Sequence, residues 1–497
     1  MKELKPINLE DLPNLPERWC WINFYSVIRK IKRGPSLKCN QDGRGIRYIT
    51  SGNLENGKVN LKKDFKFLER FNEIDRCKLL PGDLILNCVN SLEQIGKFVV
   101  FEASHGEAIV GFNNYALELN LDMVLPKYIN FVCQSKFFRR QIYFMIKRAV
   151  NQVSFATDEL ERIAIPLLSI SEQRRIVSKL EELFTKLDAG IEYLKKNQIL
   201  LKQYRQSVLK YGFEGKLTEE WRSNSIIPFD DSILRGIEKE QIDKKLEGVN
   251  VSKLPKLPSL WKWVKLGDVY NITMGQSPPG NCYNYEGNGM PLLNGPTEFG
   301  ETYPTTVQWT NKITKISEKN DLLICVRGNT TGRMNWSNQK YCIGRGLASI
   351  RPKFPTVNNK ILFFFLQMKT KELISNTTGS TFPNLTRDKL TNFLFPLIPN
   401  DEQIYIVNDI EKKISIIKNM ELIIKHHLTY LIKLRNSILK YAFEGKLVPQ
   451  DPTDESAEIL LDKIKRERES TIPIKKEKSK ITKKKSIDID NKQMRLM

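Results

Sequence analysis

The chain has 497 residues, 40% of them apolar, and carries a formal net charge of +22 at pH 7. This length predicts several domains rather than a single core, and the positive charge favours a polyanionic partner such as nucleic acid. The sequence contains no run of about 18 apolar residues and no apolar signal segment at its start, so we expect a cytoplasmic protein without membrane contact.

A first mixed domain is expected over residues 1–165. It opens with LPERWCWINF, and β-branched runs such as VVFEASHGEAIVGF, interrupted by glycine, indicate short strands. The apolar segment PKYINFVCQSKFFRRQIYFMIK, from Pro126 to Lys147, predicts a buried helix.

Residues 166–217 predict one long helix of about 40 residues, or about 60 Å at 1.5 Å per residue. Ser171 is the expected N-cap, and Gly215 follows the last periodic residue, where a glycine commonly ends a helix. Apolar side chains recur every seven residues, which is the pattern of a coiled-coil seam, at Leu180, Leu187, Leu194, Leu201 and Val208.

The same organisation then recurs. After a polar linker with some helix (218–256), LPSLWKWVKL opens a second mixed domain over residues 257–395, displaced by 242 positions from LPERWCWINF. In it, DLLICVRG and CIGRGLASIRP indicate strands, and ILFFFLQMKTKELI indicates a buried helix.

Residues 396–447 align with the first helical block at a constant offset of 230 and carry the same heptad row. They predict a second long helix, capped by Asp401 and ended by Gly445, that pairs with the first. Residues 448–497 predict a short helix followed by a disordered basic tail.

Loops rich in cations, amides and glycine are the candidate DNA contacts. Arginine can donate two hydrogen bonds to guanine, while asparagine and glutamine pair with adenine, and hydroxyls and lysines contact phosphates. The candidates are Arg29, Lys30, Arg33, Lys38, Arg44 and Arg47 in the first domain, and Gln276, Ser277, Arg327, Thr330, Thr331, Arg333 and Arg345 in the second.

The alternative is a DNA-modifying enzyme, a methyltransferase or nuclease with fused recognition domains. A methyltransferase needs an aromatic residue that stacks on the flipped base, but the nearest match to its loop, Ser277-Pro278-Pro279-Gly280, ends in glycine. The sequence has no phosphate-binding G-x-x-x-x-G-K-[ST] loop and no carboxylates at metal-ligand spacing. Eight scattered cysteines and three histidines argue against a zinc site. We therefore expect no catalytic residue and no bound metal.

Three sets of motifs together resemble the specificity subunit of type I restriction–modification systems. They are P-L-x4-E-Q at the start of each long helix, S-[VI]-L-K-x-[GA]-F-E-G-K-L at its end, and L-P-x-x-W-x-W at the start of each domain. The segment LVPQDPTDESAEILLDKIKRERE also resembles that family's C-terminus, so the resemblance extends to about residue 470 and leaves out the lysine-rich tail.

The resemblance implies an α+β fold with two target-recognition domains in tandem repeat, separated and joined by two long antiparallel coiled-coil helices with pseudo-two-fold symmetry. It implies a non-catalytic subunit whose domains each recognise one half of an asymmetric bipartite site in double-stranded DNA, with the helices setting the spacing. The other implied partners are two methylation subunits and restriction subunits, which would themselves bind S-adenosylmethionine, ATP and Mg²⁺. We expect the helices to dock the methylation subunits through Arg205, Tyr211, Phe213, Arg435, Tyr441 and Phe443.

Overall fold

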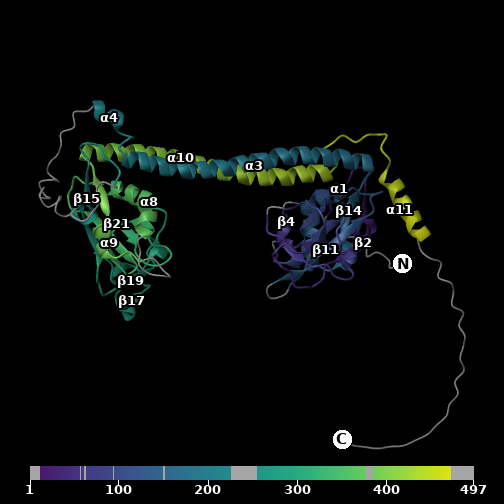
Figure 1. The fold of residues 1–497 in the computed structure, drawn as a ribbon, viewed down its shortest axis with the longest axis horizontal. Helices are drawn as coiled ribbons and strands as arrows, with labels where there is room; N and C mark the ends of the chain where they lie inside the picture. Colours follow the sequence, from purple (N-terminus) through teal and green to yellow (C-terminus); the bar gives the residue numbers. More distant parts are fainter. Residues whose placement is uncertain are drawn as a thin grey trace, which may run out of the picture. The chain divides into compact units, whose positions relative to one another are not determined.

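The chain folds into two compact units, Met1–Ile191 with Thr429–Met497, and Glu192–Leu428, called unit 1 and unit 2 below (Figure 1). The linker residues 225–253 and the tail residues 472–497 lie outside the residues that this computed structural model describes. None of the helices in the described part of the chain is long and apolar enough to cross a membrane. The described residues are 12–55, 57–60, 63–92, 94–148, 152–224, 254–375 and 384–471.

The domain of unit 1 is built around two sheets of short strands. An antiparallel sheet has the order β2 (Ile28–Arg33), β11 (Asn114–Leu119), β7 (Leu84–Asn87), β9 (Phe98–Val100). A second sheet has the order β10 (Ala108–Val110), β3 (Ile46–Ile49), β6 (Lys66–Leu68), with β10 parallel to β3. Smaller pairings join β1 (Cys20–Asn23) to β14 (Ala164–Leu167), β4 (Leu54–Glu55) to β5 (Lys58–Val59), and β13 (Val153–Ser154) to β12 (Lys147–Arg148) and β8 (Val89–Asn90).

The segment predicted as one buried helix forms two, α1 (Pro126–Gln134) and α2 (Lys136–Met145). The break is at Ser135, whose backbone is extended and whose Oγ accepts a hydrogen bond from the Phe138 N–H at 3.4 Å. A serine in that conformation is a favoured N-cap, which explains why a new helix begins there.

The domain of unit 2 repeats the four-stranded sheet and the three central strands of the second sheet, to which it adds β17 (Tyr283–Asn284) and β20 (Ile316–Ser317). Its antiparallel sheet has the order β16 (Tyr270–Met274), β24 (Leu347–Pro352), β21 (Leu322–Cys325), β22 (Met334–Trp336). The second sheet has the order β17 (Tyr283–Asn284), β19 (Gln308–Thr310), β18 (Met290–Leu293), β23 (Tyr341–Ile343), β20 (Ile316–Ser317), with β18 parallel to β23. The remaining elements are β15 (Lys262–Lys265) paired with β25 (Leu394–Leu397), and the helices α7 (Leu266–Val269), α8 (Asn359–Ser375) and α9 (Arg387–Thr391). The predicted strands and the buried helix of this domain are thereby confirmed.

The two predicted long helices are α3 (Ile170–Phe213) and α10 (Asn400–Phe443), each of 44 residues. Within unit 1 the start of α3 runs antiparallel to the end of α10, and Arg435 Nη1 lies 2.6 Å from Asp188 Oδ1. In unit 2, Gly212 near the end of α3 lies beside Ile410 near the start of α10. Two shorter helices follow them, α4 (Glu219–Asn224) and α11 (Ala457–Thr471).

The predicted N-caps of the long helices are two residues too late. Both helices begin one residue before Ser171 and Asp401, and Ser169 Oγ accepts a hydrogen bond from the Glu172 N–H at 3.0 Å. Ser169 therefore caps α3, because its side-chain oxygen satisfies an N–H of the first turn.

The predicted C-terminal ends of the two long helices are confirmed. Gly215 and Gly445 have φ angles of 71° and 69°, in the left-handed region that favours glycine. The next residue in each case, Lys216 or Lys446, donates its N–H back to the carbonyl of Tyr211 or Tyr441 at 3.0 and 2.9 Å. These bonds satisfy carbonyls that the helix end would otherwise leave unpaired.

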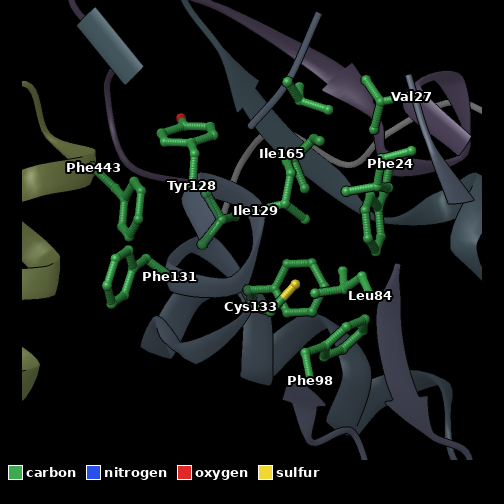
Figure 2. Packing of buried hydrophobic residues seen from close by; sticks show 14 of the residues in the cluster. Phe24, Val27, Leu84, Phe98, Tyr128, Ile129, Phe131, Cys133, Ile165 and Phe443 are labelled. Carbon is green, nitrogen blue, oxygen red and sulfur yellow. The ribbon is translucent and has the colours of Figure 1, made fainter. Parts of the chain in front are cut away.

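The end of each long helix completes the core of a domain. Phe443 at the end of α10 is buried against Tyr128 of α1, with ring centroids 5.9 Å apart (Figure 2). Phe213 at the end of α3 packs in the same way on Phe365 of α8, at 5.1 Å. Each domain is therefore closed by a helix end that lies far from it in the sequence.

Replacing two glycines of unit 1 by alanine is expected to change the free energy of unfolding in opposite directions. A Cβ on Gly445 would lie 2.2 Å from Pro16 Cγ, whereas a Cβ on Gly190, inside α3, would lie 3.8 Å from Leu431 Cδ1. We expect Gly445→Ala to cost at least about 1–2 kcal/mol, the penalty of left-handed backbone for an L-residue. Gly190→Ala should gain about 1 kcal/mol, because alanine is the better helix former. Urea denaturation of the two variants measures both; a common sign would contradict this account of the helix end.

Candidate nucleic-acid interface

Each domain is fixed to the start of a long helix by a buried Trp–Glu hydrogen bond. In unit 1, Trp19 Nε1 donates to Glu172 Oε2 at 2.9 Å; in unit 2, Trp261 Nε1 donates to Glu402 Oε2 at 2.7 Å. These residues come from the repeated L-P-x-x-W and E-Q motifs. The motifs thus join the domain to the helix, and they leave the variable loops free for another role.

The glutamine of each E-Q motif completes the connection. Gln173 Oε1 accepts from the Leu125 N–H and Gln403 Oε1 from the Asn358 N–H, both at 2.9 Å. The side-chain amides donate to the carbonyls of Leu168 and Ile398. An amide that both accepts and donates fixes the domain's orientation on the helix start as well as its position.

In unit 2 the structure brings together four of the predicted DNA contacts. The Arg345 N–H donates to Ser277 Oγ at 3.1 Å, and the Val326 N–H next to Arg327 donates to Gly346 O at 2.9 Å. Arg327, Arg345 and the nearby Gln276 are exposed. A planar guanidinium in such a position can bind a base edge or a phosphate through two parallel hydrogen bonds.

Three other predicted contacts of unit 2 hold their own loop. The Arg333 guanidinium donates to the carbonyls of Pro296 and Phe299 at 3.1 and 2.9 Å. Thr331 Oγ1 donates to Gly328 O at 2.7 Å, and Thr330 Oγ1 lies 3.4 Å from Cys325 Sγ. The structure gives these side chains a role in fixing the loop geometry.

Among the candidates of unit 1, three arginines are paired with groups of the protein itself. Arg29 pairs with Asp122 at 2.8 Å, Arg44 pairs with Asp42 at 2.9 Å, and Arg47 donates to His105 O at 2.7 Å. Lys30 and Lys38 are exposed. Arg33 is exposed too, and its guanidinium carbon lies 4.6 Å from the ring centroid of Phe112.

Lys32, in the middle of the same basic run, is buried and pairs with Asp83 at 2.8 Å. Burial raises the pKa of the Asp83 carboxyl, while the Leu80 N–H and the Lys32 ammonium act against that rise. This lysine therefore belongs to the core of the domain and not to its surface.

The sequence did not single out two features beside these loops. One is Phe112, an aromatic side chain that is 40% exposed. The other is a polar chain in unit 2, in which Tyr285, Gln308 and Asn294 are joined by hydrogen bonds of 2.5 and 2.9 Å. Exposed aromatic and amide groups are typical of surfaces that bind bases.

The end of each long helix lines a repeated pocket against the neighbouring domain. The pocket of unit 2 has a volume of about 470 Å³, and that of unit 1 about 580 Å³. Five lining positions correspond at the offset of 230 and face a phenylalanine of the domain, Phe365 or Phe137: Gln206, Ser207, Lys210, Phe213 and Glu214 in unit 2, and Asn436, Ser437, Lys440, Phe443 and Glu444 in unit 1.

The predicted docking residues differ in their surroundings. Tyr211 and Tyr441 are about half exposed, whereas Phe213 and Phe443 are buried in the cores. Arg435 pairs with Asp188 and covers the ring of Phe184 at 4.0 Å, and Arg205 is half-buried on α3. Direct contact with a partner is thus open to the tyrosines, while the phenylalanines shape the pockets.

Comparison with known proteins finds similar proteins that match most of this chain. Residues 258–426 match the type I restriction modification DNA specificity domain. The chain is 28% identical over 445 residues to the putative type I restriction enzyme MjaX specificity subunit of Methanocaldococcus jannaschii, covering 88% of this chain and 95% of that protein. Over most of its length, the chain is thus similar to type I restriction–modification specificity subunits.

Three further proteins are similar to most of this chain. The StySPI specificity subunit of Salmonella potsdam is 25% identical and covers 91% of this chain and 96% of its own length. One solved structure comes from work on complex assembly and conformational transition of the type I R-M system. It matches this chain with a TM-score of 0.68 at 25% identity, and the match covers 87% of this chain and all of that one. The HsdS subunit of Thermoanaerobacter tengcongensis has the same fold, with a TM-score of 0.54 at 24% identity over 88% of this chain and all of its own.

Proposed function

We propose that this chain recognises DNA within a type I restriction–modification complex, and that each domain binds one half of an asymmetric, split sequence. The supporting observation is a shared arrangement of sheets, which occurs twice with the same Trp–Glu connection while the loops carry different side chains. A site with the same scaffold and different base contacts in each copy is suited to two different half-sequences.

The long helices are proposed to set the gap between the two halves. In support, α3 and α10 are each one continuous helix across the boundary between the units. A helix transmits length rigidly, at 1.5 Å per residue.

Sequencing of modified bases in cells that express the chain with its methylation subunits tests both statements. We expect one asymmetric split sequence for the wild type. Seven residues inserted into both helices, after Ile191 and after Leu428, keep the heptad pattern and add about 10.5 Å. The half-sequences should then persist while the gap grows by about 3 bp, at 3.4 Å per step.

Insertion of two residues at the same points is the matched control, because it rotates the seam out of phase and should destabilise the protein. If the variant with seven inserted residues is active but keeps the original gap, the spacing proposal is wrong, whereas the proposal of two recognition domains is unaffected. A symmetric or unsplit sequence in the wild type would contradict recognition by two different domains.

We further propose that two methylation subunits dock at the repeated pockets, and that S-adenosylmethionine, ATP and Mg²⁺ are bound by partner subunits and not by this chain. The sequence supports the second point, since it lacks the loops that hold these ligands. The chain purified by itself should therefore neither methylate nor cut DNA, and turnover of S-adenosylmethionine by it alone would refute this.

Stoichiometry tests the docking proposal. Ser207 and Ser437 are exposed, equivalent positions that line the two pockets. Replacing either serine by tryptophan should fill one pocket and reduce the bound methylation subunits from two to one, and the double variant should bind none. Analytical ultracentrifugation at saturation measures this. A one-to-one wild-type complex, or equal binding by all variants, contradicts the proposal.

A further inference from the structure

The domain of unit 1 contains a turn after β10 that presents Phe112. Its backbone is fixed by hydrogen bonds from the Gly111 N–H to Ile49 O at 2.9 Å and from the Asn114 N–H to Gly111 O at 2.9 Å. The Phe112 N–H donates to the hydroxyl of Tyr48 at 2.6 Å. With its own N–H satisfied, the exposed Phe112 side chain is available to interact outside the turn.

The domain of unit 2 has the same turn after β23. Here the Gly344 N–H donates to Leu293 O at 2.8 Å and the Leu347 N–H to Gly344 O at 3.0 Å. The Arg345 N–H again donates to a hydroxyl, that of Ser277. Phe112 and Arg345 therefore occupy equivalent positions, although they are separated by 233 residues (345 minus 112) and the repeated helices by 230.

The strand that ends beside the turn is also equivalent in the two domains: it is β2 in unit 1 and β16 in unit 2. A Cβ on Gly34 would lie 1.9 Å from Val110 O, and a Cβ on Gly275 would lie 2.2 Å from Gly344 O. The residue before each glycine ends the strand, and it is Arg33 in unit 1 and Met274 in unit 2. One domain thus has its arginine on the strand and the other has it on the turn.

The arginine of unit 1 is held at the turn by aromatic rings. The guanidinium carbon of Arg33 lies 4.6 Å from the ring centroid of Phe112 and 5.5 Å from that of Tyr115. Stacking covers the faces of the guanidinium and leaves its edge, which carries the N–H donors, available for a planar acceptor. The exposed Arg345 offers the same chemistry in unit 2.

We propose that this turn is a base-contact point in both domains, occupied by the Arg33 guanidinium in unit 1 and by Arg345 in unit 2. Phe112 is then a positioning residue that acts through Arg33. The inference rests on the DNA-recognition function proposed above and specifies its contacts. The arginine is attached to a different backbone position in each domain, on the strand in unit 1 and on the turn in unit 2. The two domains therefore select different half-sequences.

The test is enrichment of bound duplexes from a random DNA pool by the full chain in complex with its methylation subunits. Arg33→Ala and Arg345→Ala should each relax base preference in a different half of the site, by roughly 5- to 150-fold, the range for one good arginine–base contact. Phe112→Ala should relax the same half as Arg33→Ala, whereas Phe112→Tyr, which keeps an aromatic face, should retain the preference.

Matched controls come from lysines beside the same two strands, away from the turn. Lys340 precedes β23, and Lys78 forms a bridge with Ile109 of β10; both are lysines with an acidic neighbour. Lys340→Ala and Lys78→Ala should leave both halves unchanged. The inference is overturned if the arginine variants weaken all sequences equally, if they relax the same half, or if Phe112→Ala changes neither half. A wild-type complex that enriches no sequence would instead refute the proposed DNA-recognition function itself.

Discussion

Replacing Phe443 by alanine is expected to destabilise unit 1 by about 3–5 kcal/mol, the usual cost of deleting a buried phenylalanine ring. The ring is 1% exposed and its edge contacts are with Tyr128 and Phe137, both at centroid distances of 5.9 Å. Figure 2 places Phe443 of α10 beside the aromatic residues of α1. The cavity would therefore open in a domain that is built from the other end of the chain.

Hydrogen exchange with mass spectrometry locates the effect. Phe443→Ala should lower protection in α1 and α2, while Phe213→Ala should lower protection in α8 of unit 2, where its ring meets Phe365. Tyr441→Ala removes an exposed ring two residues away and should change the free energy of unfolding by no more than about 0.5 kcal/mol. Loss of protection in the other unit, or none, would show that the helix ends do not complete these cores.

The helices and their ends could be predicted because their signals are local and repeated. The heptad rows and the glycines at 215 and 445 need only their neighbours in sequence. The start of α3 was misplaced because Ser169 and Ser171 both suit an N-cap, and the local sequence does not distinguish them. The break at Ser135 was missed because the apolar pattern continues through it.

The site was harder to predict because its partners are distant. An arginine in a glycine-rich loop looks free in the sequence, yet the carbonyls that hold Arg333 lie 34 and 37 residues away. Phe112 follows a buried strand and is typical of a core residue by sequence alone. Its equivalence to Arg345 is visible only through backbone hydrogen bonds, because the two domains differ in length between their shared ends.

Replacing Arg222 by alanine is expected to cost about 3–5 kcal/mol in unit 2, the penalty for leaving one member of a buried ion pair uncompensated. Glu402 is fully buried and accepts hydrogen bonds from Trp261, Thr218 and Arg222. Without the guanidinium, its negative charge is left with neutral donors only. The double variant Arg222→Ala/Glu402→Gln should regain most of the loss, since the glutamine carbonyl can still accept from Trp261. A single variant as stable as the wild type would contradict this account.

Unit 1 supplies the contrasting case. The positions that correspond to Thr218 and Arg222 at the offset of 230 are Val448 and Pro452, and neither can donate a side-chain hydrogen bond. Among the described residues, Glu172 Oε1 has no hydrogen-bond partner, and burial raises the pKa of this carboxyl above its ordinary 4.5. Glu172→Gln should therefore be neutral or stabilising at pH 7, opposite in sign to Arg222→Ala.

The pH dependence of stability tests this account of Glu172. A carboxyl whose pKa is raised by folding stabilises the native state below pH 4.5, and that contribution is lost as the pH rises through the raised value. A glutamine at position 172 does not titrate, so the stability of Glu172→Gln relative to the wild type should increase between pH 4.5 and pH 7. Urea denaturation at the two pH values, with hydrogen exchange to assign the change to unit 1, measures the difference. A relative stability that falls with rising pH would mean that Glu172 is stabilised as a carboxylate, as Glu402 is by Arg222.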